Sequence, residues 1–206
     1  MKKAKCSTIF FLIAISLIFA TYGDVFAEMK LRDKPKKLTE RDIKAVVKKL
    51  NFFDKELNEE GNCPNDFVDN GDGTITDRTT GLMWEQKGSE NEKGWYHAKK
   101  YVKALNKKKF AGYKDWRLPT TEELYSLLQP STNQQLYIHS VFATKPSLCW
   151  SIDTSDMATP WYISQTRKVT LDYKEGTVSD AYTGVKPSGA SANNFSSYVR
   201  AVRTIK

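Results

Sequence analysis

The stretch AGYKDWRLPTTEELYSLL, residues 111–128, decides how this chain folds. Pro119 disfavours helical backbone in the residue before it, so the tripeptide WRL is predicted to be extended. Thr120 can cap a helix and Glu123 can complete a capping box, so a short helix should begin directly after the proline. Three leucines then form the inward face of that helix. The stretch therefore predicts a buried strand or bend joined directly to a capped helix.

Residues 1–27 have the pattern of a secretory signal peptide. A lysine-rich start precedes an apolar run from Ile9 to Ala20, and Val25 and Ala27 supply the small residues of a cleavage site. An uncleaved anchor helix is the alternative, although the run is short for a bilayer span. We expect export to the periplasm, the cell surface or the medium. Cleavage would leave about 180 residues, which suits one domain with a small appendage.

Charge and cysteine content set two further expectations. The net charge is +8, a basic excess that permits weak attraction to anionic polymers without establishing it. Cys63 and Cys149 would both remain after cleavage, and an oxidising compartment makes a disulfide between them the prediction. Two free thiols are the alternative.

The segment Thr39–Leu50 is predicted to be an amphipathic helix. Its apolar residues recur at helical spacing, and Thr39 with Asp42 forms a variant of the capping box. Whether this apolar stripe docks on the rest of the chain or on a partner is open. Residues 28–37 before it are polar and lysine-rich, and they predict a mobile lead-in.

A hairpin and a second helix should follow. The run DNGDG is dense in turn residues between two short β-rich runs, which predicts a hairpin. Trp95, Ala98, Val102 and Leu105 then share one side of a predicted helix. A patch for a polyanion is one interpretation of the lysines on and after this helix, and a solvated face with cations at a helix end is the other. The residues of the predicted patch are Lys99, Lys100, Lys103, Lys107 and Lys108.

The last third of the chain changes to short β-rich runs, with a hairpin turn expected at Glu175–Gly176 and a loop at GVKPSGASANN, residues 184–194. Helices that precede a cluster of antiparallel strands predict an α+β fold with a small antiparallel sheet, two or three helices and long loops. Trp150 and Trp161 lie among these strands. They are either stacking platforms for a sugar or core aromatics.

Motifs for catalysis and metal binding are missing. No Gly-x-Ser-x-Gly elbow and no phosphate-binding loop occur. Aligned on an EF-hand loop, the DNGDG run has Val68 at the first position and Thr79 at the twelfth, so two essential ligands are absent. His97 and His139 have no flanking cysteine cluster for zinc. We therefore predict no enzyme activity, no metal, no cofactor and no nucleic-acid partner.

Three motifs in order resemble the Lcl C-terminal domain family: FVDNGDGTITDRTTGLMWEQ, then FAGYKDWRLPTTEEL, then YVRAVR. This family occurs in exported bacterial proteins and is named from a collagen-like surface adhesin. The resemblance runs from about Asn65 to Arg203. It implies residues 28–62 as a lead-in with the amphipathic helix and residues 63–206 as the family domain.

The resemblance also implies a C-type-lectin-like fold. WRLPTTEEL is similar to a scaffold segment of the formylglycine-generating enzymes, so Trp116, Arg117 and Leu118 should connect the sheet to the helix. The late cysteines that those enzymes need for copper chemistry are absent after Cys149. A cysteine pair common in the family is replaced near Val102 and at Ala201. The calcium-binding tripeptides of sugar-binding C-type lectins are missing too.

The resulting expectation is a secreted or cell-surface, non-enzymatic binding module. The family adhesin suggests a sulfated glycan, and a surface protein is the other partner considered. Loops 153–160 and 186–194 should form the surface, with Trp150, Asp153, Trp161 and Asn193 as ligand-binding residues. Alternatives are a hydrolase or oxidase-related enzyme on the same fold, and a structural accessory of an envelope assembly that docks through the Thr39–Leu50 helix. The sequence leaves the ligand and the oligomeric state open.

Overall fold

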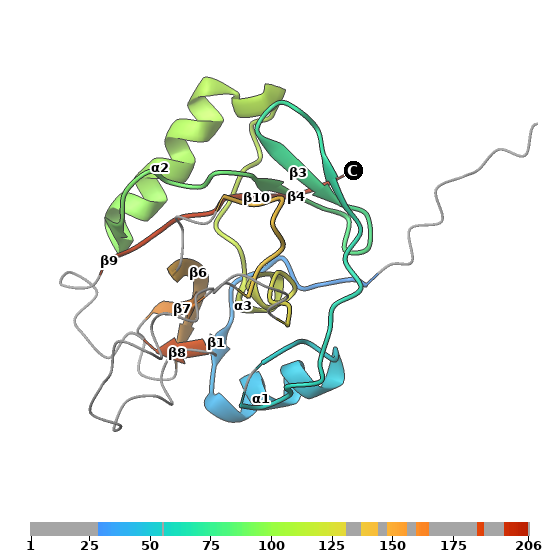
Figure 1. The fold of residues 1–206 in the computed structure, drawn as a ribbon. Coiled ribbons are helices and arrows are strands. Elements are labelled where there is room, and N and C mark those ends of the chain that lie inside the picture. The colour runs from blue at the N-terminus through green and yellow to red at the C-terminus, as the bar shows by residue number, and fades with distance from the viewer. Residues whose placement is uncertain are drawn as a thin grey trace, which may run out of the picture.

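The computed structural model describes residues 29–54, 56–130, 137–143, 148–155, 160–164, 185–187 and 196–205. Helices and small sheets are mixed along these ranges, which confirms the α+β class (Figure 1). No helix in them is long and apolar enough to cross a membrane. In chain order the elements are β1 (Lys37–Leu38), α1 (Glu40–Lys49), β2 (Phe67–Asp69), β3 (Thr74–Asp77), β4 (Leu82–Glu85), β5 (Lys93–Gly94), α2 (Trp95–Lys108), the 3-10 helix η1 (Phe110–Gly112), α3 (Thr121–Tyr125), β6 (Leu148–Ser155), β7 (Pro160–Ser164), β8 (Val185–Pro187), β9 (Ser196–Ser197) and β10 (Val202–Thr204).

An antiparallel sheet with strand order β10-β4-β3-β2 lies at the centre of the molecule. The DNGDG run forms the predicted turn between β2 and β3. Successive side chains of a strand point to opposite faces, and all four residues of β4 are buried, so both faces of the sheet are covered there. Trp84 belongs to one hydrophobic cluster and Met83 to another. The sheet thus separates two parts of the core.

The first cluster joins the N-terminal segment to the middle of the chain. Val47 of α1 and Phe52 just after it are fully buried against the same cluster as Leu124 of α3. The apolar stripe of α1 therefore docks on this chain, which answers the question that the sequence left open. Other buried members of the cluster are Leu38, Ile43, Phe53, Cys63, Ile75, Leu82, Trp84, Tyr125, Leu127, Leu128, Tyr137, Phe142, Cys149 and Val202.

The second cluster packs α2 onto the other face of the sheet. Its buried members are Met83, Ala98, Val102, Leu105, Trp116, Leu118, Trp150, Val199 and Ala201. Val102 and Ala201, the positions where the resemblance implies that a cysteine pair is replaced, belong to the same cluster. Figure 1 shows α2 and α1 at opposite ends of the molecule, because each helix covers a different cluster.

The WRL tripeptide connects sheet and helix as predicted. Arg117 exchanges both backbone hydrogen bonds with Val202 of β10, at 2.9 and 3.0 Å. Its guanidinium also forms an ion pair with Glu123 at 2.5 Å. Glu123 in turn completes the predicted capping box with Thr120 at the start of α3. This segment is therefore scaffold. The helix is shorter than the leucine pattern suggested, since it ends at Tyr125 and the next two leucines lie buried in the turn beyond it.

Residues 29–38, here called the strap, are anchored, so the prediction of a mobile lead-in is wrong. The Arg32 guanidinium donates two hydrogen bonds to the Asp153 carboxylate, both 2.8 Å long. Its Nε contacts Glu122 at 3.2 Å. The strap ends as β1, which pairs in parallel with β6 through Lys37–Thr154 and Leu38–Ser155. The anchors lie 90 or more positions away in the chain, so local composition gave no sign of them.

The second sheet has the order β1-β6-β7-β8. β6 and β7 correspond to the β-rich runs LCWSID and PWYIS. β8 lies within residues 184–194, which were predicted to be a loop, and it pairs with β7. That prediction is wrong for Val185–Pro187, because a strand partner compensates for weak local propensity. The turn predicted at Glu175–Gly176 lies outside the described residues. The C-type-lectin-like arrangement stays a prediction.

Candidate functional site

Helix α2 carries the site that the structure supports best. Its inner side is fixed by Ala98, Val102 and Leu105, which are buried. Its end is fixed by Asn106, whose side chain donates to the Trp116 carbonyl and accepts from the Trp116 amide, both at 2.8 Å. Lys109 then adopts a left-handed conformation with φ of 53° and ends the helix. A rigid helix therefore presents its opposite side to solvent.

The outward side of α2 is a row of cations that begins with an aromatic ring. Tyr96, Lys100, Lys103 and Lys107 follow one another at spacings of four, three and four residues, and all are exposed. Residues at these spacings share one side of a helix, so their side chains form a single row about 16 Å long. Lys99 is exposed beside this row. These five residues are called the lysine face.

Two ammonium groups of the lysine face lie over aromatic rings. Lys100 Nζ is 4.5 Å from the ring centre of Tyr96, and Lys99 Nζ is 4.9 Å from that of Trp95. Such contacts contribute about 0.5–1 kcal/mol at exposed sites and restrict the long side chains. Tyr96 has 63% of its surface exposed, which is unusual for a large ring. The face thus combines positive charge with a flat apolar surface.

The charge of the lysine face is not balanced by its own helix. The sequence of α2, WYHAKKYVKALNKK, contains no aspartate or glutamate. Among the described residues, the ion pairs join carboxylates to other basic side chains, and none involves the lysine face. Lys108 is also exposed but lies to one side of the row. All five lysines predicted as a patch are therefore at the surface, and four of them belong to the lysine face.

Trp150 and Asp153 do not lie at a ligand surface, and their prediction as ligand-binding residues is corrected. Trp150 has no exposed surface, donates from Nε1 to the Lys93 carbonyl and packs edge-on against Trp95 at 5.5 Å. Asp153 is also fully buried. Its carboxylate accepts the two bonds from Arg32 and one each from the backbone N–H groups of Lys36 and Thr121. Both residues hold the fold together.

For Trp161 the structure describes only the backbone, and Asn193 it does not describe. The backbone of Trp161 lies in β7, opposite Pro187 of β8. Asn193 lies outside the described residues. Their roles as ligand-binding residues stay predictions.

The predicted disulfide is absent, since Cys63 and Cys149 are free thiols. Cys63 Sγ lies 3.8 Å from Met29 Sδ of the strap. Burial raises the pKa of Cys63 to about 12 and that of Cys149 to about 11, with Arg200 beside Cys149 opposing the latter shift. Both sulfurs are therefore protonated, and each has its own neighbours in the core in place of the other cysteine.

A buried polar network ties the lysine face to the central sheet. Tyr101 of α2 donates its hydroxyl proton to Glu85 of β4, whose other carboxylate oxygen accepts from the Ala201 amide at 3.3 Å. Burial raises the pKa of Glu85, and burial together with the Glu85 charge raises the pKa of Tyr101. Arg200, fully buried nearby, donates to the carbonyls of Glu85, Gln86 and Ala143. This network fixes the orientation of α2 on the sheet.

Two residues were missed at the level of sequence, Tyr96 of the lysine face and the structural anchor Arg32. Tyr96 could have been found, because it precedes Lys100 by four residues and Lys103 by seven, which places it on the same helical side. Arg32 could not, because nothing near it in the sequence points to Asp153.

An α+β domain with a central antiparallel sheet, covered by one long cationic helix and one short capped helix, defines the class of this molecule. Comparison with protein families matches residues 73–203 to the Lcl C-terminal domain. The chain therefore belongs to the Lcl C-terminal domain family, as the three sequence motifs predicted. No curated protein and no solved structure matches the chain. The lysine face lies within the family domain, whereas the strap and α1 lie outside it.

Proposed function

We propose that the protein is an exported, non-enzymatic binding module that holds a sulfated polysaccharide on the lysine face of α2. One observation carries the proposal: a straight row of exposed lysines with no carboxylate on its own helix, headed by an exposed tyrosine. Sulfate groups repeated along a polymer suit a row of ammonium groups, and a sugar ring suits the exposed face of Tyr96.

Export is proposed from residues 1–27, whose pattern is that of a cleaved signal peptide. An exported basic protein meets the polysaccharides of surfaces and matrices, and sulfated polymers carry the repeated negative charges that a row of lysines can bind. Periplasm, cell surface and medium all fit this proposal.

Binding is favoured over catalysis because Asp153, the carboxylate considered for chemistry, is buried and fully hydrogen-bonded within the fold. Asp153 has four donors on its carboxylate and no exposed surface, so it has no capacity left for a substrate. The role as an assembly accessory is also disfavoured, because the apolar stripe of α1 packs inside this molecule.

The test is binding of the purified protein to immobilised heparin over a range of salt concentrations. Binding that depends on about three lysines should weaken roughly 10- to 20-fold when salt is raised threefold, because counterions compete for the polymer. Reversing the charge in Lys100→Glu, Lys103→Glu and Lys107→Glu together should weaken it at least tenfold. The substituted side chains are exposed, so the variant should keep its fold.

The matched control reverses three exposed lysines outside both helices, in Lys30→Glu, Lys34→Glu and Lys87→Glu. This control has the same net charge as the α2 variant but leaves the lysine face intact, and it should retain most of the binding. Equal loss in both variants would show that net charge alone attracts the polymer. Tight binding that is insensitive to salt would contradict the electrostatic basis of the proposal.

A further inference from the structure

We propose that the protein bridges two separate strands of polyanionic polysaccharide, because α1 presents a second cationic face at the opposite end of the molecule from α2. This inference rests on the function proposed for the lysine face and adds a second site to it. The second face consists of Arg41, Lys44 and Lys48 and is called the α1 face.

The geometry of the α1 face follows from the same packing rule as that of α2. Arg41, Lys44 and Lys48 are spaced by three and four residues and are all exposed. They therefore share one side of the helix over about 10 Å. The opposite side is held by Ile43 and Val47, which are buried in the first cluster. The three cations must consequently face solvent.

Two acidic residues of α1 lie next to this face: Glu40 precedes Lys44 by four residues, and Asp42 is already engaged. The carboxylate of Asp42 accepts from both the amide and the hydroxyl of Thr39, at 2.8 and 2.7 Å, and lies 3.7 Å from Lys36 Nζ. Among the side chains that the structure describes, no ion pair involves the three cations of the α1 face. With three cations against Glu40, the α1 face therefore keeps a net positive charge for a partner.

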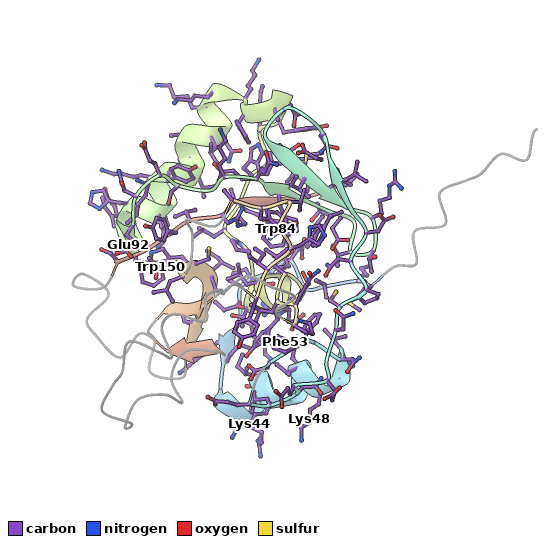
Figure 2. The ribbon with its side chains drawn as sticks, in the orientation of Figure 1. Lys44, Lys48, Phe53, Trp84, Glu92 and Trp150 are labelled. Carbon is purple, nitrogen blue, oxygen red and sulfur yellow. The ribbon has the colours of Figure 1, made fainter. Side chains whose placement is uncertain are left out.

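The two faces cannot serve one straight polymer. The central sheet and both hydrophobic clusters separate α1 from α2. Figure 2 shows Lys44 and Lys48 extending into solvent at the end of the molecule opposite to α2. A polysaccharide lying along one helix thus runs past one end of the protein only. Two strands, one at each end, satisfy both faces.

The second face is a property of this chain's added segment. α1 comprises residues 40–49 and the family match covers residues 73–203. The family domain alone would provide one face. The N-terminal segment, fixed in place by the strap and by the first cluster, supplies the other and turns a single-site binder into a cross-linker.

A two-layer capture experiment tests the bridging. The protein is bound to immobilised heparin and washed, and a second, fluorescent heparin is then added. The quantity measured is the second heparin captured per molecule of bound protein. The wild-type chain should capture it, and Arg41→Glu, Lys44→Glu and Lys48→Glu together should lower the captured ratio about tenfold while first-layer binding persists.

The controls separate this inference from the proposed function. Loss of first-layer binding in the wild type would contradict the function of the lysine face, whereas first-layer binding without second-layer capture would contradict bridging alone. A self-associated protein could bridge with two α2 faces, and it would then capture equally well after reversal of the α1 face. That outcome would also overturn the inference. A variant with glutamine at the same three positions should behave like the glutamate variant, since it removes the charge with less cost to the helix end.

Discussion

Two buried carboxylates, Glu85 and Asp153, are accommodated in different ways. Asp153 is paired with the Arg32 guanidinium and two backbone amides, so its charge has a partner of opposite sign. Glu85 accepts from the Tyr101 hydroxyl and the Ala201 amide, both neutral donors. Burial raises the pKa of Glu85 because these donors compensate less for lost hydration, although the charge of Arg200 opposes the shift.

Glu85 should make the protein lose stability as pH rises above the ordinary carboxyl pKa. In the unfolded chain the group loses its proton near 4.5, while the folded state retains it to higher pH. In that window the folded state binds more protons, so the free energy of unfolding falls with rising pH. Glu85→Gln cannot ionise, and its stability relative to wild type should therefore improve between about pH 4 and pH 7.

Urea denaturation of both proteins across that pH range measures the difference. If the glutamine amide itself costs stability, that cost is the same at every pH. It shifts the plot of unfolding free energy against pH without changing the slope of the plot. Glu90→Gln, at an exposed position, is the control for the removal of one carboxylate. Parallel curves for wild type and Glu85→Gln would mean that Glu85 ionises alike in both states.

At the level of elements, the strap depends on Arg32, which pairs with Glu122 and with the buried Asp153. The Arg32 side chain is 21% exposed and its partner Asp153 is fully buried. Removing a partner from such a pair leaves a buried charge uncompensated, which costs more than the pair itself contributes. The strap also places β1 beside β6 and its Met29 sulfur beside Cys63, so loss of the anchor should weaken the whole N-terminal attachment.

Arg32→Ala should therefore lower the free energy of unfolding by about 3 kcal/mol, at the low end of the range for broken buried pairs because Arg32 is partly exposed. Lys34→Ala, two residues along the strap, is the control. The side chain of Lys34 is 84% exposed, and its loss should change stability by no more than about 0.5 kcal/mol. Equilibrium urea unfolding compares the two, and equal effects would contradict the structural role of Arg32.

The elements that were predictable from sequence are those specified locally. Both capping boxes, at Thr39 and Thr120, form as predicted because their partners lie three residues away. The DNGDG hairpin and the helix of the lysine face follow from turn chemistry and periodicity. β1 and β8 were missed, since each becomes a strand only through a partner elsewhere in the chain.

The same distinction explains the candidate site. Periodicity places the lysines of α2 outside, but it cannot say which aromatics among the later strands are covered. Trp150 is buried because Trp95 of α2 packs on it, and Asp153 because the strap closes over it. Trp95 and the strap, which bury these two residues, are distant from them in sequence. The residues near Trp150 and Asp153 therefore gave no indication that both would be buried.

On the scale of the whole molecule, the family domain and the N-terminal segment share one core. Leu38, Val47 and Phe52 are buried in the same cluster as Leu124 and Leu128. A chain without the segment would expose the inner faces of α3 and of the sheet. The family match begins only at residue 73, yet the cooperative unit extends back to the strap.

Deleting residues 28–60 should therefore abolish the native state of the remainder. Removal of Phe52 alone should cost about 3–5 kcal/mol, which is a large part of the stability of a typical domain. Near-ultraviolet circular dichroism and dye binding measure the loss of fixed packing and the exposure of apolar surface. A deleted chain that still unfolds cooperatively, with the stability of the full chain, would show instead that the segment serves something outside the domain.

Residues 196–205 have a consequence for when the molecule can fold. They supply β9 and β10, and β10 lies between β4 and Arg117, where it receives hydrogen bonds from both sides. The ribosome synthesises these residues after all the others described, so β4 and Arg117 lack their partner strand until synthesis reaches them. Under the export proposed above, a nascent chain kept open in this way could pass through a narrow channel before it folds.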